Sequence, residues 1–489
     1  MAKKRGFFSR LLLLHRMFIR AVVLGTLAYL AYGWGASLVK PITVGLFFPL
    51  TGRLGADGTE ASQAVRFAID EINAGGGLLH RKLDVVEVDG ASSDDIQSLV
   101  KTLVVDDGAD VIFGCMRPAC RRQLSEILSG YSTLLVYPFH LEGLDGIAEK
   151  LGAIAHSEKY VKTSARFPGE DFLHSLYAAL VVSTKIGASG EALEVVAPEP
   201  ESPGPVTRER VSERRVLATG PMPNQDLIPG IRWAMDKFGP RVFLVFNEGL
   251  YGRVVEQITE NAVIAGKGSV VGRSALDWTR DGDGEAAAKR IAELRPDVLI
   301  NVAIGSENVA LYKTLDILVP RDSRIPNLLL HTGYEELREI GWETLATGYV
   351  MSFYDAESET KTNSAFKALF AREYGDAREP DSQFYLAYSS VMVWAAAVKK
   401  AKTADADAVL KVLPGVMLDL PSGPERISHK SLHPMLRPLI LQVNEQGQFR
   451  PLWSAPQPIE PVSTYPFKSK ENWEKFLREL YRNWAGSWR

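Results

Sequence analysis

The sequence predicts an α/β fold with two lobes, each built on a parallel sheet covered by helices. Short apolar runs rich in branched and aromatic residues alternate with amphipathic helical segments over residues 42–136, and the same alternation begins again near residue 228. The chain has 489 residues, which exceeds one ordinary domain, and its hydrophobic content of 46% can fill two large cores.

The first complete strand–helix–strand unit is residues 42–89. Residues 42–48, ITVGLFF, predict a strand buried on both faces, and residues 49–52, PLTG, end it. A helix follows whose apolar positions recur every 3.6 residues, three glycines at 75–77 end it, and residues 83–88 predict the next strand. Open α/β sheets bind ligands in such strand-to-helix loops, although on pattern alone the PLTG loop is equally well a tight connection.

The remaining elements continue the alternation. In the first series, helices are expected at 94–106 and 118–128 and strands at 110–114 and 134–136. In the second series, helices are expected at 228–238, 253–265, 284–294 and 306–317, with strands at 241–246, near 270, at 298–302 and at 328–331. Later segments predict helices at 382–400 and 404–413 and strands near 427 and at 439–443.

Several motifs recur in a characteristic order along the chain. They are ITVG and PLTG, AIDEINAGGGLLHRKL, VIFGC, LLVYPFHLEGLDG, TGPMPNQ, RVFLVFNEGLYGR, DVLINVAIGSENVALYK, EELREI, LAYSSVMVWAAAVKKA, LDLPSG and FRPLWSAPQPIEP. Each motif alone is weak, but the ordered set resembles type I periplasmic solute-binding proteins of ABC transporters. This superfamily includes leucine/isoleucine/valine-binding proteins, and the closest resemblance is to its amide- and urea-binding branch.

The resemblance implies two Rossmann-like lobes joined by a hinge that the backbone crosses three times and that closes over a solute. It implies an extracytoplasmic protein that binds urea, a short-chain amide or a related small polar solute and works with ABC permease subunits in the inner membrane; a homodimer is compatible with it. The expected divisions are 1–40 as signal peptide or anchor, 41–145 as the start of lobe one, 146–215 as a partly disordered insertion, 216–225 as a hinge crossing, 226–350 as the start of lobe two, 351–455 as returning segments of both lobes, and 456–489 as a tail.

Polar residues at facing strand ends are the expected solute ligands. From lobe one they are Thr51, Cys115, Met116, Arg117 and Tyr137, and from lobe two they are Asn247, Glu248, Tyr251, Gly305, Ser306 and Thr332. Tyr137 could stack on a planar amide, and Glu248 could accept a hydrogen bond from an NH₂ or ammonium group.

Three positions depart from the amide and urea binders. Arg117 with Pro118 replaces a hydroxyl residue, Gly249 replaces an aromatic residue, and Leu141 replaces the aromatic of the YEG motif. Arg117 could clamp a carboxylate, or it could be a solvent-facing residue at a helix start. The solute could therefore be larger or anionic, or the site could have lost ordinary binding.

The N-terminus is basic and then apolar. Net charge is −3, but the first 37 residues hold six basic and no acidic residues, which leaves −9 on the rest and makes nucleic acid an unlikely partner. Residues 21–39 carry no charge. They predict either a signal peptide cleaved near residues 35–37 or an uncleaved inner-membrane anchor. Both alternatives export residue 41 onward to the periplasm.

Three further features have open interpretations. An exported location permits a disulfide between Cys115 and Cys120, but their spacing at a strand-to-helix junction favours two free buried thiols. Within the insertion, residues 172–186 predict a helix and 189–215 a mobile loop, which is either a partner contact or lid, or a tolerated surface insertion. The tail helix at 473–484 has one aromatic face, which either docks on a lobe or contacts a membrane or partner.

Enzymatic and cofactor chemistry is not expected. The sequence has no GxSxG, no P-loop, no GxGxxG after a strand, and no CxxC or HExxH zinc motif. The adjacent carboxylates Asp70 and Glu71 point in different directions on a helix. The alternative to a transport component is a membrane-anchored sensor or partner-binding protein that retains the fold.

Overall fold

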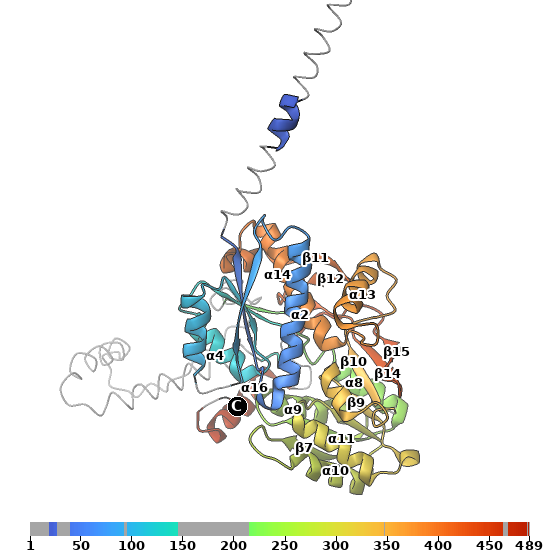
Figure 1. Cartoon of the computed structure of the whole chain (residues 1–489). Helices are drawn as coiled ribbons and strands as arrows, with labels where there is room; N and C mark the ends of the chain where they lie inside the picture. The colour runs from blue at the N-terminus through green and yellow to red at the C-terminus, as the bar shows by residue number, and fades with distance from the viewer. Residues whose placement is uncertain are drawn as a thin grey trace, which may run out of the picture.

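The computed structural model describes residues 19–26, 40–91, 95–144, 215–346, 348–462, 468–486 and 488, and shows two lobes, each with a central sheet between helices (Figure 1). The helix expected at 172–186 and nearly all of the loop expected at 189–215 lie outside these residues. Residues 19–26 form an exposed helix. Within the described part of the chain, no helix is long and apolar enough to cross a membrane.

Lobe one is built on a five-stranded parallel sheet in the order β2-β1-β3-β4-β5. Its strands are β1 (Ile42–Phe48), β2 (Leu83–Asp89), β3 (Val111–Gly114), β4 (Leu134–Tyr137) and β5 (Val216–Ala218). Side chains alternate across β1, so that Val44, Leu46 and Phe48 enter one core and Phe47 enters the other. Both faces of the sheet are therefore buried, as the continuous apolar run predicts.

Helices cover both faces of this sheet (Figure 1). On one face lie α2 (Gly55–Ala74) and α14 (Ser382–Ala401); on the other lie α3 (Ile96–Lys101), which continues into a π-helical turn (Thr102–Asp106), and α4 (Pro118–Leu128). Next to α14 lie α13 (Lys361–Tyr374), α15 (Ala406–Val412) and a small antiparallel sheet of β11 (Met417–Leu420), β12 (Gly423–Ile427) and β13 (Pro434–Met435).

Lobe two is built on a seven-stranded sheet in the order β15-β14-β10-β9-β8-β6-β7. The strands are β6 (Arg241–Asn247), β7 (Ser269–Leu276), β8 (Val298–Asn301), β9 (Asn327–Leu329), β10 (Gly348–Ser352), β14 (Leu439–Val443) and β15 (Phe449–Ser454). Five are parallel, but β14 and β15 pair antiparallel at one edge. A short turn joins these two, which an antiparallel pair permits and a parallel pair does not.

Helices also cover both faces of the second sheet. On one face lie α8 (Leu227–Phe238) and α9 (Leu250–Ala265), and on the other lie α10 (Asp283–Leu294), α11 (Ser306–Leu318) and α12 (Tyr334–Ile340). The tail forms α16 (Lys470–Asn483), whose Trp473 and Leu477 are fully buried in the core beside α8 and α9. The tail therefore docks on lobe two, one of the two alternatives that its aromatic face left open.

The backbone passes between the lobes three times. Residues 219–226 connect β5 to α8, residues 353–360 connect β10 to α13, and residues 436–438 connect β13 to β14. Gln225 Nε2 donates hydrogen bonds to the carbonyls of Pro434, at 3.0 Å, and Ile459, at 2.9 Å. The buried side chain of Gln225 thus links the first crossing to segments that lie beside the third crossing.

The expectation of two free thiols is wrong. Cys115 follows β3, Cys120 lies in the first turn of α4, and the two form a disulfide with their Cα atoms 6.2 Å apart. That separation is within the range that disulfides span. The chain reverses from strand to helix between the two cysteines, so their side chains meet although the sequence spacing suggested that they diverge.

Candidate solute-binding cleft

A cleft lies between the lobes, at the carboxyl ends of their strands. It encloses about 730 Å³ of empty space, its open mouth included. Its walls are residues 116–119 and 139–140 of lobe one, residues 247–252, 278, 302, 304 and 331 of lobe two, and Gln383 at the start of α14. This is where open α/β sheets bind ligands, because strand-to-helix loops with free backbone and side-chain groups converge there.

Five of the expected ligand residues line the cleft, and their role as ligands stays a prediction. They are Met116, Arg117, Asn247, Glu248 and Tyr251. Met116 and Arg117 lie in the loop between β3 and α4, and the other three lie at the end of β6 and the start of α9. The sequence motifs at these two strand ends thus face each other across the gap between the lobes.

Arg117 brings a positive charge into the cleft. Its guanidinium carbon lies 5.8 Å from the centre of the Trp278 ring, which comes from lobe two. Burial lowers the pKa of Arg117 below its ordinary value. Among the residues that the structure describes, no carboxylate pairs with this guanidinium. A partly buried cation of this kind is suited to an anion that enters the cleft.

The polar side chains of lobe two that line the cleft already form hydrogen bonds within lobe two. Asn247 Nδ2 donates to the carbonyl of Ile304 at 3.1 Å, and its Oδ1 accepts from the Ile304 amide at 2.9 Å. Arg253 Nε donates to Glu248 Oε1 at 3.0 Å, so the negative charge expected to meet an NH₂ or ammonium group is paired. The Trp278 Nε1 group donates to the Glu248 carbonyl at 2.7 Å, which holds the indole against the wall.

Gly249 has a backbone conformation that favours glycine. Its φ is 139°, it is the residue before α9, and it lies in the cleft wall. An L-residue rarely adopts this backbone conformation. An aromatic residue at this position would therefore need a different loop conformation.

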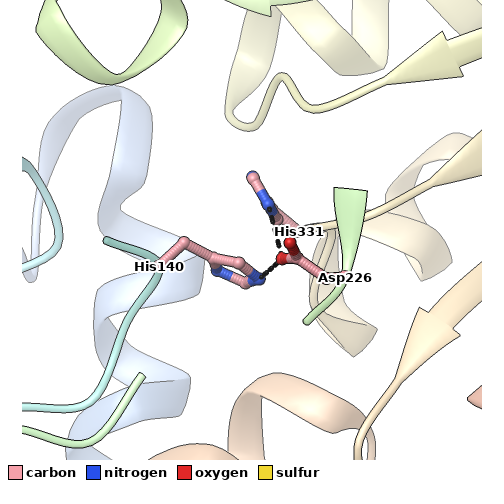
Figure 2. Close-up of side chains that lie close together, drawn as sticks. All are labelled: His140, Asp226 and His331. Carbon is pink, nitrogen blue, oxygen red and sulfur yellow. Dashed lines mark ion pairs between the residues drawn. The ribbon is translucent and has the colours of Figure 1, made fainter. Parts of the chain in front are cut away.

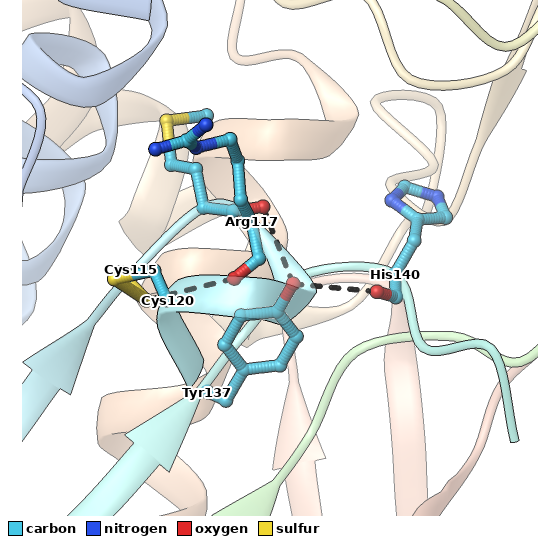
Figure 3. The surroundings of a disulfide bond; sticks show 6 residues. Cys115, Arg117, Cys120, Tyr137 and His140 are labelled. Carbon is cyan, nitrogen blue, oxygen red and sulfur yellow. Dashed lines mark hydrogen bonds between the residues drawn. A yellow bond between two sulfur atoms is a disulfide. The ribbon is translucent and has the colours of Figure 1, made fainter. Parts of the chain in front are cut away.

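Tyr137 and the disulfide lie close to Arg117 and His140 of the cleft wall but are not part of its lining (Figure 3). The Tyr137 hydroxyl lies 3.2 Å from the Met116 carbonyl and 3.4 Å from the His140 carbonyl, and its ring is fully buried. Cys115 is also buried, and its bond to Cys120 ties the Met116 loop to α4. The structure thus does not place Tyr137 and Cys115 in the cleft lining, and their expected contact with the solute stays a prediction.

The other expected ligands lie outside the cleft. Thr51 is exposed and its hydroxyl donates to Asp89 Oδ2 at 2.6 Å. Gly305 approaches Arg53 of lobe one, and Ser306 Oγ accepts from Arg53 Nη1 at 3.4 Å. Thr332 is buried and absent from the lining. Gly305 and Ser306 thus contact the opposite lobe outside the cleft lining.

The sequence reasoning missed several residues of the cleft. Phe139, Trp278 and Gln383 line it, and so do two histidines, His140 and His331, which lie next to the buried Asp226 (Figure 2). His140 lies within the LLVYPFHLEGLDG motif, and His331 directly precedes Thr332. Nothing in their local pattern shows that strands 190 residues apart bring them together.

Comparison with known proteins agrees with this architecture. A family model described as "Periplasmic binding protein domain" matches residues 42–149 and 208–471. Two curated relatives match over shorter stretches: a Leu/Ile/Val-binding protein of Rhizobium johnstonii, 32% identical over 97 residues, and a Leu/Ile/Val-binding protein homolog of Brucella melitensis, 26% identical over 117 residues. The matches cover 20% and 24% of this chain, but only 26% and 32% of those proteins.

Solved structures share the fold at low sequence identity. A solute-binding protein of an ABC transporter from Rhodopseudomonas palustris, in complex with 3,4-dihydroxybenzoic acid, aligns with a TM-score of 0.62 at 15% identity, over 86% of this chain and 98% of that one. The branched-chain amino acid transporter substrate-binding protein LivJ from Streptococcus pneumoniae, in complex with isoleucine, aligns with a TM-score of 0.59 at 16% identity, over 84% and 99%. With two sheet-based lobes, a cleft between them and a family match over most of its length, this chain belongs to the periplasmic binding protein family.

Proposed function

We propose that this protein is the extracytoplasmic solute-binding component of an ABC transporter and that it closes its lobes on a small organic carboxylate with an apolar or planar body. The observation that carries the proposal is Arg117, a cation on the cleft wall with no carboxylate partner among the described residues. The solute's carboxylate would pair with this guanidinium. Its apolar body would pack against the rings of Phe139, Tyr251 and Trp278.

This proposal replaces the expectation of urea or an amide with a carboxylate. Glu248 was the expected acceptor for an NH₂ group, but Arg253 neutralises it. The solved structures that share the fold support a carboxylate, since those described above hold a dihydroxybenzoic acid and isoleucine. ABC permease subunits would be the partners of the closed form. Near the N-terminus, basic residues are followed by an uncharged apolar segment, and this pattern supports export.

Thermal unfolding with and without solute tests the proposal. Benzoate, 4-hydroxybenzoate and isoleucine represent carboxylates, and urea and acetamide represent the amide alternative. A solute at 100 times its Kd adds about 2.7 kcal/mol, which raises Tm by several degrees. We expect a carboxylate to raise Tm. A response to urea or acetamide alone would contradict the proposal and restore the amide assignment. No response across the panel would favour the sensor or partner-binding alternative.

Substitution of Arg117 tests the role of the cation. Arg117→Gln is expected to weaken carboxylate binding by roughly tenfold to a hundredfold, because a hydrogen bond to a charged group is worth about 1.5–3 kcal/mol. Isothermal titration of wild type and variant measures the difference. Arg66→Gln is the matched control, since Arg66 pairs with Glu87 on lobe one, outside the cleft lining. Equal affinities of Arg117→Gln and wild type would exclude Arg117 as the carboxylate ligand.

A further inference from the structure

Three buried side chains meet where the two lobes and the hinge join (Figure 2). His140 follows β4 in lobe one, His331 follows β9 in lobe two, and Asp226 ends the first hinge crossing. One ligand atom from each residue lies within 4.8 Å of the other two. His140 is 7% exposed, His331 is 8% exposed and Asp226 is fully buried. Three potential metal ligands thus converge from separate parts of the chain.

The distances suit a bound metal ion. Asp226 Oδ2 lies 3.2 Å from His140 Nε2 and 3.7 Å from His331 Nε2. In a tetrahedral site with bonds of about 2.0–2.2 Å, neighbouring ligand atoms are roughly 3.3 Å apart. The two imidazole rings are 3.5 Å apart between centroids and tilted by 40°. Asp226 Oδ2 thus lies at a suitable distance from both nitrogens, but the two imidazole rings would have to turn apart for both Nε2 atoms to bind one ion.

The hydrogen bonding of the cluster leaves two of the three ligand atoms available. His140 Nε2 and Asp226 Oδ2 are buried, and their contact does not have the geometry of a hydrogen bond. His331 Nδ1 lies 3.2 Å from the Val302 carbonyl, which accepts its proton and leaves the Nε2 lone pair facing Asp226. Metal-binding histidines are commonly oriented in this way by a backbone carbonyl on the second nitrogen. The Tyr251 hydroxyl, 3.1 Å from Nε2, now occupies that lone pair and would have to turn away.

We propose that His140, Asp226 and His331 bind one divalent transition-metal ion of the class that prefers imidazole, with Zn²⁺ as the reference ion. Nitrogen and carboxylate oxygen donors suit this class. His140 and His331 also line the cleft, so the proposed ion site lies beside it. Because each lobe supplies one histidine and the hinge supplies the aspartate, the ion holds the lobes in the closed arrangement. The inference does not depend on the identity of the organic solute.

Metal titration of the full chain tests this site without any solute. After removal of metal by a chelator and dialysis, calorimetric titration with Zn²⁺ is expected to show one ion per chain. Co²⁺ is expected to give the visible absorption of a tetrahedral nitrogen and oxygen site. Zn²⁺ is also expected to raise Tm by several degrees. Absence of Zn²⁺ binding, or binding without a tetrahedral Co²⁺ spectrum, would overturn the proposal.

Variants locate the ion at these three residues. His140→Gln, Asp226→Asn and His331→Gln are each expected to weaken Zn²⁺ binding at least tenfold; the glutamine and asparagine replacements keep polar side chains of similar size, which favours folding. His429→Ala is the matched control, because His429 is exposed and outside the cluster. Tyr251→Phe should retain Zn²⁺ binding, since it removes only the competing hydroxyl. Wild-type affinity in His140→Gln and His331→Gln, with circular dichroism showing folded protein, would place the ion elsewhere and contradict the proposal.

Discussion

Glu425 is one of the buried carboxyl groups that make the stability of this protein depend on pH. Glu425 lies in β12 beside Tyr385, and burial raises the pKa of its carboxyl to about 8 from an ordinary value of 4.5. Between these two values the folded state keeps a proton that the unfolded state releases. The contribution of Glu425 to stability is therefore fully present below about pH 4.5 and is lost as pH rises through about 8, at a rate of roughly 1.4 kcal/mol per pH unit at most.

Glu425→Gln is expected to remove this part of the pH dependence. Glutamine has the shape of the protonated acid and cannot ionise, so the variant should gain stability over wild type at pH 8.5 and differ little at pH 5. Urea unfolding at both pH values measures the two differences. Glu445→Gln, at an exposed position, is the control and should show no such change between the two pH values. Parallel pH profiles for wild type and Glu425→Gln would show that the buried carboxyl does not titrate in this range.

At the scale of one element, the tail helix α16 contributes a fully buried tryptophan to lobe two. Trp473 is 0% exposed and packs in the core that contains Leu477 and residues of α8 and α9. Truncation of a buried tryptophan to alanine costs about 3–5 kcal/mol, because the cavity refills only in part. Trp473→Ala should therefore lower the free energy of unfolding by that amount, as measured by urea unfolding.

Glu479→Ala on the exposed face of the same helix is the matched control. A surface substitution of this kind changes stability by no more than about 0.5 kcal/mol. If Trp473→Ala cost as little as the control, the tail would contribute nothing to the fold. Its aromatic face would then be available to a membrane or a partner, which was the other alternative for this helix.

For the whole molecule, ion pairs between the two lobes stabilise the arrangement in which the lobes contact each other. Arg53 follows β1 in lobe one and pairs with Asp281 and Glu307 of lobe two, its Nη1 lying 3.3 Å from Glu307 Oε1. Partly exposed ion pairs are worth about 0.2–1 kcal/mol and weaken in salt. Arg53→Ala is thus expected to weaken solute binding a few-fold at low ionic strength, with a smaller loss at high salt. Titration calorimetry at two salt concentrations measures this.

The matched control is Arg321→Ala, because Arg321 pairs with Glu343 within lobe two. Solute affinity should be the same in this variant as in wild type at both salt concentrations. A loss of affinity in Arg53→Ala that does not change with salt would show that Arg53 acts through packing, for example through its backbone contact with Gly305, and that its charge is not what favours closure.

Local patterns were sufficient for most of the secondary structure. The strand at 42–48, the helix at 118–128 and the strand at 439–443 have the expected bounds, and the helices of lobe two begin or end within a few residues of their predicted positions. Apolar periodicity, proline and glycine act over one or two turns of chain, so they can be recognised without the fold. The length of the chain and the repeated alternation of strands and helices predicted two lobes. The ordered set of motifs predicted the family, which the family match confirms.

What the tertiary structure decided is which side chains meet. The turn between β3 and α4 joins Cys115 to Cys120, contrary to the spacing argument. The hinge crossings bring His140, Asp226 and His331 together, and they leave Thr51, Gly305 and Ser306 outside the cleft lining. Convergence of this kind depends on how two lobes are oriented by three distant backbone segments. No residue's local pattern carries that information, whereas the periodicity of each strand and helix is present in its own sequence.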